Sequence, residues 1–445
     1  MIRHVVTAAL VPAIVAGCTA SSLESQSPEA QLYFPTGAAI APGESHLFVA
    51  NANSDLRFNS GAISVVDLAH VDAIIEAWLT AEEVPAGCSR DPGLRQTLVC
   101  PAELFLAATA GAGVRIGNFA TAIAVQDRGG GRSRLVVPTR GDPSITWIDW
   151  EDGALRCGGS TDAQPLCDDE HRLTFGDEGA AASRDEPFAA YADSEHDFAI
   201  VTHLRTGAIR LIDSPRDGAA RIADVVRNVF ASHPKTRESG AIGVAGRATS
   251  TGDRVVYVGS TTDHRVQTFT VGRPSNGAPP FLLTGHHFFL DSVGPLDPGK
   301  ATDTRSMAFS AGGDRLYLAS RTPPLLQIFD TSPGPTGFPV NAPIGARDLC
   351  RQASTLTVAD VGDGERVYVS CFEDGQVYIV DPRAGGRTDD IVTVGRGPFA
   401  VVAAPARRRL YVTNFLEDTI AVLDLTPGSA TRNRVVLRIG EPRRR

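Results

Sequence analysis

The sequence is poor in lysine and in long apolar segments. Only Lys235 and Lys300 are lysines among 42 basic residues, against 51 acidic residues, and the formal net charge is -9. An acidic chain of this kind is a poor partner for nucleic acid, so we expect no nucleic acid among its partners. Downstream of the N-terminal segment, no apolar run approaches the length of a membrane span.

Several signatures of catalysis and cofactor binding are also missing. No two cysteines have a two-residue spacing, and no Cys-x-x-Cys-His occurs, which argues against a zinc site and against covalent haem. No Gly-x-Ser-x-Gly marks a serine nucleophile. His286 and His287 are adjacent, so in a strand they would point to opposite faces and would not easily share an ion. We predict no metal and no cofactor, and we assign no catalytic residue.

The N-terminus has the pattern of an export signal. A short basic start with Arg3 is followed by an apolar run that ends Val15-Ala16-Gly17-Cys18. This resembles the bacterial lipoprotein signal, with Val15 at a position where that signal usually has leucine. The resemblance implies that residues 1–17 are removed and that Cys18 carries lipid, which would anchor the protein to a membrane. The alternative is an ordinary secretory signal with an incidental cysteine.

The residues after Cys18 extend this prediction. Thr19 is not the aspartate that resembles an inner-membrane retention signal, which favours the outer membrane. Residues 18–30 are rich in serine and poor in large apolar side chains, so we expect a flexible tether. We therefore predict a lipoprotein of the cell envelope, held at the outer membrane and either periplasmic or surface-exposed.

The rest of the chain is organised by one repeating unit. Its clearest copy, Arg409–Leu425 (RLYVTNFLEDTIAVLDL), reads as two short strands around a polar turn, and Gly397-Pro398 begins a further apolar strand before it. Related copies end at positions 67, 149, 213, 270, 330, 381 and 424. One such unit cannot bury its own faces, so seven consecutive copies indicate the blades of a propeller.

The motif Tyr411-Val412-Thr413-Asn414, with Gly395-Arg396-Gly397-Pro398 ahead of it, resembles the YVTN-type β-propeller repeat. The match covers roughly residues 31 to 440 and is best in the last two blades and the first. It implies an all-β fold: a single seven-bladed β-propeller of four-stranded antiparallel blades over 31–445, preceded by the lipoprotein signal peptide. The family includes surface-layer proteins, binding domains and relatives of lactonases and of haem- or quinone-dependent enzymes, so the motif specifies fold rather than chemistry.

The topology leaves the closing strand of the ring open, and it places the long insertion after the first blade. Either Gln31–Phe34 or Val435–Ile439 is expected to supply the outermost strand that completes blade seven. The long insertion Thr80–Ile116 is expected above the ring. We call the face that carries the turns after each second strand, and the connections from blade to blade, the top face.

Six cysteines remain if Cys18 is lipidated, and they fall into local pairs, as expected in an oxidising compartment. Sequence alone does not fix the pairing. We predict Cys88 with Cys100 in the insertion, Cys157 with Cys167 on the bottom face, and Cys350 with Cys371 on the top face.

The top opening of a propeller is the usual place for a ligand. The ends of the second strands place polar residues there, including Asn51, His203 and Asn414. The segments that enter the leading strands add charged residues: Arg115, Glu186, Arg247, Asp303, Arg305 and Arg396. Arginines with a few carboxylates suit an anionic or sugar-like ligand, whereas the alternative is a solvated rim whose polar residues only serve the turns.

Two functions follow. We predict a non-enzymatic binding or scaffolding module that is a monomer and that holds an envelope protein or a small ligand at its top face. The alternative is a lactonase-like hydrolase that uses the arginine-rich opening on a sugar lactone.

Overall fold

The computed structural model describes residues 25–443, except 82–83, 107–111, 159–163, 176–184, 231–238, 249–251, 253, 276, 291–301 and 384–385. The predicted signal peptide and the lipidation site at Cys18 lie outside these residues, as does the tether up to residue 24. In the described part, no helix combines the length and the apolar character needed to cross a bilayer.

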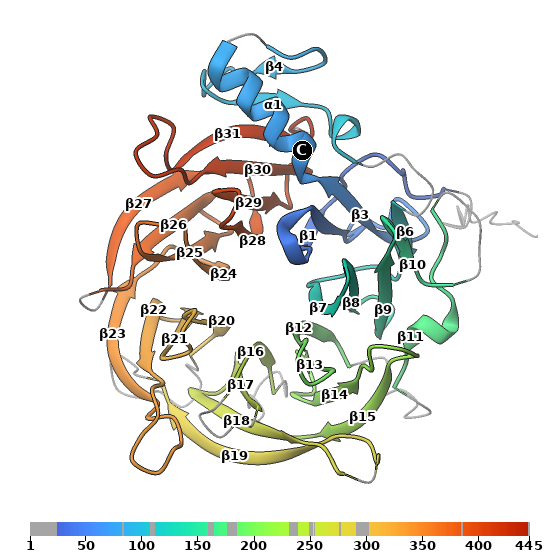
Figure 1. Ribbon diagram of the computed structural model, residues 1–445, viewed down its shortest axis with the longest axis vertical. Coiled ribbons are helices and arrows are strands. Elements are labelled where there is room, and N and C mark those ends of the chain that lie inside the picture. The colour runs from blue at the N-terminus through green and yellow to red at the C-terminus, as the bar shows by residue number, and fades with distance from the viewer. Residues whose placement is uncertain are drawn as a thin grey trace, which may run out of the picture.

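Seven antiparallel sheets stand around a central axis, as predicted, and form a seven-bladed propeller (Figure 1). Blade one contains β1 (Pro35–Ile40), β2 (His46–Asn51), β3 (Gly61–Asp67) and β6 (Gly113–Ile116), with the 3₁₀ turn η1 (Pro42–Glu44). Blade two contains β7 (Ala124–Gly129), β8 (Arg132–Thr139), β9 (Ser144–Glu151) and β10 (Ala154–Arg156), and β11 (Arg172–Leu173), which follows η3 (Asp169–His171), also pairs with β9.

The other five blades have the same order, from the inner strand to the outer one. Blade three is β12 (Pro187–Asp193), β13 (Phe198–His203), β14 (Ile209–Asp213) and β15 (Arg221–Val226); blade four is β16 (Ala241–Ala248), β17 (Arg254–Ser260), β18 (Arg265–Gly272) and β19 (Phe281–Phe289). Blade five is β20 (Thr304–Phe309), β21 (Arg315–Arg321), β22 (Pro324–Asp330) and β23 (Ala342–Asp348). Blade six is β24 (Ala353–Asp360), β25 (Glu365–Cys371), β26 (Gln376–Asp381) and β27 (Arg387–Thr393); blade seven is β28 (Pro398–Ala404), β29 (Arg409–Asn414), β30 (Thr419–Asp424) and β31 (Arg434–Ile439).

The two middle strands of each blade are the most deeply buried because both of their faces pack against neighbouring blades. In β29, Leu410 packs toward blade six and Tyr411 toward blade one, and both are at most 1% exposed. Successive side chains of a strand point to opposite faces, so the near-continuous apolar runs of the repeat fill two interfaces at once. This explains why the repeat motif predicts the fold well.

The ring closes where blade seven meets blade one. β31, which spans the predicted Val435–Ile439, is the outermost of the four regular strands of blade seven. Gln31–Phe34 forms no strand; instead, the Phe34 amide donates a hydrogen bond to Asp418 Oδ1 at 2.7 Å. On the inner side, Thr413 Oγ1 donates to the Thr36 carbonyl at 2.7 Å.

The insertion after β3 does not lie above the ring, so that expectation is wrong. It contains α1 (Leu68–Ala81), β4 (Ser89–Arg90), β5 (Leu98–Cys100) and η2 (Ala102–Leu104), and it packs against the outer edge of blade seven (Figure 1). β5 pairs in parallel with β31, and β4 pairs with β5. We call the segment from α1 to η2 the clasp, because it leaves blade one and extends the sheet of blade seven.

All three predicted disulfides are present: Cys88–Cys100, Cys157–Cys167 and Cys350–Cys371. Cys371 ends β25 on the top face and Cys350 lies just before β24, as expected. Disulfides of this kind persist in oxidising compartments, which indicates an extracytoplasmic protein.

Candidate functional site: a phenylalanine- and arginine-lined cavity on the top face

A cavity of about 920 Å³ opens at the centre of the top face. Residues from the turns after second strands and from the connections between blades line it, which is where the sequence placed the ligand opening. Its volume lies in the range that small-molecule sites usually have. We call it the top cavity.

Phenylalanines supply much of the wall, and the sequence analysis did not single them out. Five of them line the top cavity, and each is half-buried: Phe119, Phe188, Phe372, Phe399 and Phe415. Phe415 is central to the group, with ring centroids 6.0 Å from Phe372 and 6.3 Å from Phe399. Such a wall offers aromatic faces to the flat or apolar part of a ligand.

The predicted ring of strand-end residues does not face the top cavity. Asn51, His203 and Asn414 are fully buried, as are their counterparts in the other blades. Asn51 Nδ2 donates to Ser64 Oγ on β3 at 2.9 Å, and Asn414 Nδ2 donates to the carbonyl of Val394, in the connection before β28, at 3.0 Å. Both amides therefore bind within the fold.

The residue directly after each of these positions lines the cavity instead. In six of the seven blades this residue belongs to the lining: Ala52, Arg140, Leu204, Arg321, Phe372 and Phe415. Side chains alternate along a strand, so a shift by one position moves a prediction from the cavity to the interior. The signal was therefore in the sequence, one residue further along the chain.

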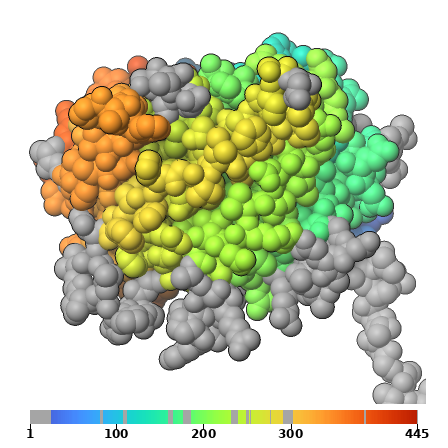
Figure 2. Space-filling view, turned by 90° about the horizontal axis from the view of Figure 1, so that it is seen from below, coloured from blue at the N-terminus to red at the C-terminus, as the bar shows by residue number. Residues whose placement is uncertain are grey.

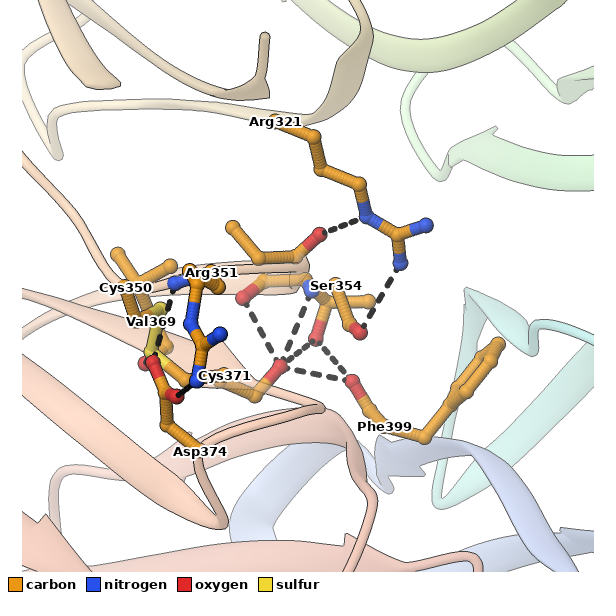
Figure 3. The surroundings of a disulfide bond; sticks show 11 residues. Arg321, Cys350, Arg351, Ser354, Val369, Cys371, Asp374 and Phe399 are labelled. Atoms are coloured by element: carbon orange, nitrogen blue, oxygen red, sulfur yellow. Dashed lines mark hydrogen bonds and ion pairs between the residues drawn. A yellow bond between two sulfur atoms is a disulfide. The ribbon is translucent and has the colours of Figure 1, made fainter. Parts of the chain in front are cut away.

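Arg321 is a cation with an unusual environment in this wall. Its Nε donates to the Ala353 carbonyl at 2.7 Å, and Nη2 lies 3.4 Å from Ser354 Oγ (Figure 3). These contacts span from blade five to the start of blade six, beside the Cys350–Cys371 disulfide. No carboxylate forms an ion pair with Arg321 in the part of the chain that the structure describes.

Burial and the positive charge of Arg305 lower the pKa of Arg321 to about 10, although Asp303 acts in the opposite direction. The guanidinium therefore remains charged at neutral pH. Arg305 also lines the cavity, and Asp303 holds it with two contacts of 2.8 and 2.9 Å. The sequence analysis predicted Asp303 and Arg305 at this opening, but not Arg321. Asp303 pairs with Arg305, so these three side chains together carry one net positive charge.

Of two further predicted residues, Arg396 belongs to the lining, whereas Glu186 does not and instead pairs with the lining residue Arg140. Glu186 accepts a hydrogen bond from Arg140 Nε at 3.0 Å, and the Arg140 guanidinium lies 5.6 Å from the centroid of the Phe188 ring. Arg396 lines the cavity and donates to the carbonyl of Leu416 at 3.2 Å. Both arginines are thus held in place by the fold around them.

The structure places Arg115 and Arg247 away from the cavity. Arg115 lies on β6, the outermost strand of blade one, where its Nε donates to the Gln164 carbonyl at 3.0 Å. Arg247 was expected at the start of the leading strand of blade four, at Gly246–Thr249. That strand, β16, begins earlier, at Ala241, so Arg247 is near its far end and donates to the Thr331 carbonyl.

His203 belongs to a buried cluster within blade three rather than to the cavity wall. Its Nδ1 lies 2.9 Å from Asp185 Oδ1, and its Nε2 lies 2.9 Å from Arg210 Nη1. Arg210 also pairs with Asp185 at 2.5 Å, and Phe175 covers both the arginine and the histidine. Arg210 Nη1 also lies 3.1 Å from Nδ1. Because the guanidinium only donates and an ionised Asp185 only accepts, we assign a neutral imidazole with its proton on Nδ1 and its acceptor at Nε2. The cluster is closed to a ligand.

The carboxylates of the lining are Glu373 and Asp374, in the turn after β25. Both pair with Arg351 at 3.3 Å, and no histidine belongs to the lining among the described residues. The described residues also contain no group of three or more His, Cys, Asp or Glu side chains placed to hold a metal. The chemistry that the cavity offers is cation-assisted binding of an anion against aromatic rings.

No protein-family model and no curated protein matches the chain. Solved β-propellers are similar to it in fold. A periplasmic gluconolactonase from Pseudomonas aeruginosa is 16% identical with a TM-score of 0.54, over 82% of this chain and 87% of that one. The β-propeller domain of Cps50 (Swd1) from Myceliophteria thermophila is 13% identical with a TM-score of 0.53, over 91% of this chain and 100% of that one. Likeness at this level of identity shows the propeller fold alone.

Proposed function

We propose that this chain is a binding protein of the cell envelope, and that its top cavity takes a small molecule with an oxyanion and a flat apolar body. The observation that carries the proposal is Arg321, a partly buried guanidinium that forms no ion pair with a carboxylate among the described residues and is set in a wall of phenylalanines. Removing a charge from water is costly unless a partner compensates for it. A carboxylate or phosphate on a ligand would supply that partner.

The test uses ligands that differ in one property. We would titrate the purified chain calorimetrically with 4-hydroxybenzoate, with its uncharged methyl ester and with gluconate, an anion without a ring. Charge-assisted hydrogen bonds contribute about 1.5–3 kcal/mol, so Arg321→Ala should weaken 4-hydroxybenzoate binding about tenfold to a hundredfold and leave the ester unaffected. Arg387→Ala, at an exposed arginine on the outer strand of blade six, is the matched control.

Two results would refute this function. One is that none of the three ligands binds at millimolar concentration; the other is that Arg321→Ala binds 4-hydroxybenzoate as tightly as the unchanged protein does. Gluconate binding that exceeds benzoate binding would keep the role of the arginines and remove that of the phenylalanines.

Lactone hydrolysis is the second candidate. It is supported by the gluconolactonase among proteins of similar fold and by Glu373 and Asp374, the two carboxylates of the lining. Both carboxylates are already paired with Arg351, so neither is set up as a free general base. Hydrolysis of glucono-δ-lactone above the uncatalysed rate, lost in Glu373→Gln or Asp374→Asn, would favour this candidate over simple binding.

Anchoring by lipid at Cys18 is part of the proposed function, and it places the top cavity in the envelope. Cys18→Ala should leave a chain that is recovered without lipid, in the aqueous phase of a Triton X-114 partition, whereas the unchanged protein enters the detergent phase. Detergent partitioning of the Cys18→Ala chain would contradict the anchor.

A further inference from the structure

The outermost strand of blade four, β19, differs from every other sheet edge of the ring. Its nine residues, Phe281–Phe289 (FLLTGHHFF), contain no Asp, Glu, Lys or Arg. In each of the other six blades, the outermost regular strand carries at least one arginine: Arg115, Arg156, Arg221, Arg347, Arg387 and Arg434. In blade seven the sheet continues past β31 to β4, and this edge strand carries Arg90. Charges at a sheet edge oppose pairing with another chain, and β19 lacks that protection.

The edge is also apolar where it meets solvent. Leu283 is 52% exposed and Phe289 is 56% exposed, and β19 ends the described order of its sheet. Near its start another blade intervenes, where the Leu282 amide donates to Asp224 Oδ2 at 2.8 Å. Further along, Gly285 and His286 form a bulge opposite Thr268, and the Gly285 carbonyl accepts a hydrogen bond from Gln267 Nε2 of β18 at 2.8 Å. On either side of this bulge, the strand lies at the edge of the described sheet.

A neighbouring segment of blade five continues this surface. Phe338 is 62% exposed and Val340 is 46% exposed, and Phe338 lies 6.1 Å from His286, centroid to centroid. The two segments enclose a groove of about 280 Å³. Figure 2 views the ring from this side, with the yellow atoms around β19 crossing the face beside the orange atoms of blade five. The apolar patch therefore spans two blades.

We infer that β19 is a self-association surface, and that two copies of this chain pair antiparallel along it. Composition argues for a second copy as the occupant. The apolar residues of β19 stand at both of its ends, with Thr284, Gly285, His286 and His287 between them. A two-fold axis near Gly285 would set Phe281 of one copy opposite Phe289 of the other. An isologous interface needs such self-complementarity.

Pairing would join two four-stranded blades into one continuous sheet of eight strands and cover the exposed Leu283 and Phe289. Uncharged strands meet without like-charge repulsion, and main-chain hydrogen bonds supply the attraction, as in other cases of strand addition. This inference replaces the expectation of a monomer. It is independent of the top cavity, because β19 lies at the outer rim of the ring.

The experiment is sedimentation velocity of the purified full chain from about 1 µM to about 200 µM, a range in which a moderate affinity is measurable. We expect a concentration-dependent dimer. Leu283→Lys, which places a charge on the edge of each copy, should weaken the dimer at least tenfold. Ile391→Lys places the same charge at a similarly exposed residue of β27, the outer strand of blade six, and should leave the dimer unchanged.

Hydrogen exchange gives a second readout that needs no variant. Amides of residues 281–289 should exchange more slowly at about 200 µM than at about 5 µM, whereas the other outer strands should not change. A chain that stays monomeric throughout the range overturns the inference. So does a dimer that Leu283→Lys leaves intact, or one that forms without protection of β19.

Discussion

At the scale of single residues, two arginines illustrate how this fold uses charge. Arg210 is buried in blade three, but Asp185 and His203 satisfy it from two sides. Arg321 is partly buried in the cavity wall, and its partners there are a main-chain carbonyl and a serine hydroxyl. The first arrangement is closed and structural. In the second, no carboxylate among the described residues forms an ion pair with the guanidinium, which is the property expected of a site that binds an anion.

The buried cluster predicts how stability depends on pH. Burial lowers the pKa of His203 below its ordinary value of about 6.5, although Asp185 acts against this. The unfolded chain therefore binds a proton on this histidine at a higher pH than the folded chain does. As a result, the free energy of unfolding falls as the pH drops below about 6.5. We expect a loss on the order of 1 kcal/mol between about pH 7.5 and pH 5.5, measured by urea denaturation at each pH.

His203→Gln should remove this part of the pH dependence, even if the variant is less stable at both pH values. Half-buried His46 also has a lowered pKa, because of its burial, so the unchanged protein and the variant must be compared at each pH. His70→Gln, at an exposed histidine, is the control and should keep the full pH dependence. An unchanged slope in His203→Gln would contradict the assignment of a neutral buried imidazole.

Asp185 acts in the same direction at lower pH. Burial alone would raise the pKa of this carboxyl, but His203, Arg210 and Thr206 together hold it well below its usual range. Its contribution to stability is therefore present above the ordinary pKa of an aspartate, near 4, and is lost only in stronger acid. The two residues thus act in separate pH windows.

At the scale of the element, the repeat predicts strands better than it predicts which side chains reach the cavity. Tyr411 and Val412 are buried because both faces of β29 pack against neighbouring blades, and any apolar run satisfies that requirement. The residues that face the cavity are singled out only by register. Asn414 and Phe415 are adjacent, and only the second lines the cavity. Because the blades were aligned on the polar residues at their strand ends, the prediction selected the buried residues and not the residues that line the cavity.

Blade four, whose repeat is irregular, and the insertion after β3 show where the sequence pattern fails to predict the structure. In blade four, the leading strand was predicted to begin at Gly246, whereas β16 begins at Ala241. Glycines interrupt the apolar pattern of this strand and make its start hard to recognise. In the insertion, Leu68, Val71, Ile75 and Trp78 follow helical spacing and are all buried, and Asp67 caps the first turn with a 2.8 Å bond to the Ala69 amide. Helix α1 could therefore have been predicted from the sequence. The parallel pairing of β5 with the distant β31 was not, because no local pattern encodes it.

At the scale of the whole molecule, the last blade is tied to the first outside its four regular strands. All four regular strands of blade seven come from the C-terminal end of the chain. We call the contact between blades seven and one the joint. It depends on hydrogen bonds and ion pairs between residues of the two blades and of the clasp. Arg407 donates to the Glu44 carbonyl and pairs with Asp72 on α1, and the Arg407 amide donates to the Glu44 carboxylate at 3.1 Å. Arg407 therefore lies in the contact between blades seven and one.

The clasp supplies the second tie, and it is covalently braced. One apolar cluster joins blade one, the clasp and blade seven through residues such as Leu47, Leu98 and Leu437, all fully buried. Cys100 is the last residue of β5, and its disulfide to Cys88 holds the strand that pairs with β31. A segment that leaves blade one thus completes the outer edge of blade seven.

Removing this brace predicts an effect at a distance. The replacement Cys88→Ser with Cys100→Ser should lower the free energy of unfolding by about 2–3 kcal/mol, the amount expected for a closed loop of this size. It should also speed hydrogen exchange at the amides of β31, more than 300 residues away along the chain, because β5 would no longer be held against that strand. Denaturation and exchange mass spectrometry measure the two effects.

The Cys157–Cys167 disulfide provides the matched control, because it closes a loop of nearly equal length: its sequence separation is 10, against 12 for Cys88–Cys100. Loop-closure entropy depends weakly on length, so the two double replacements should cost nearly the same stability. Only the first should affect β31, because Cys157 and Cys167 belong to the cluster between blades one and two. If both replacements speed exchange in β31 equally, the change reflects overall destabilisation, and the clasp does not close the ring. If only the first does, closure depends on the clasp as well as on the joint at Arg407.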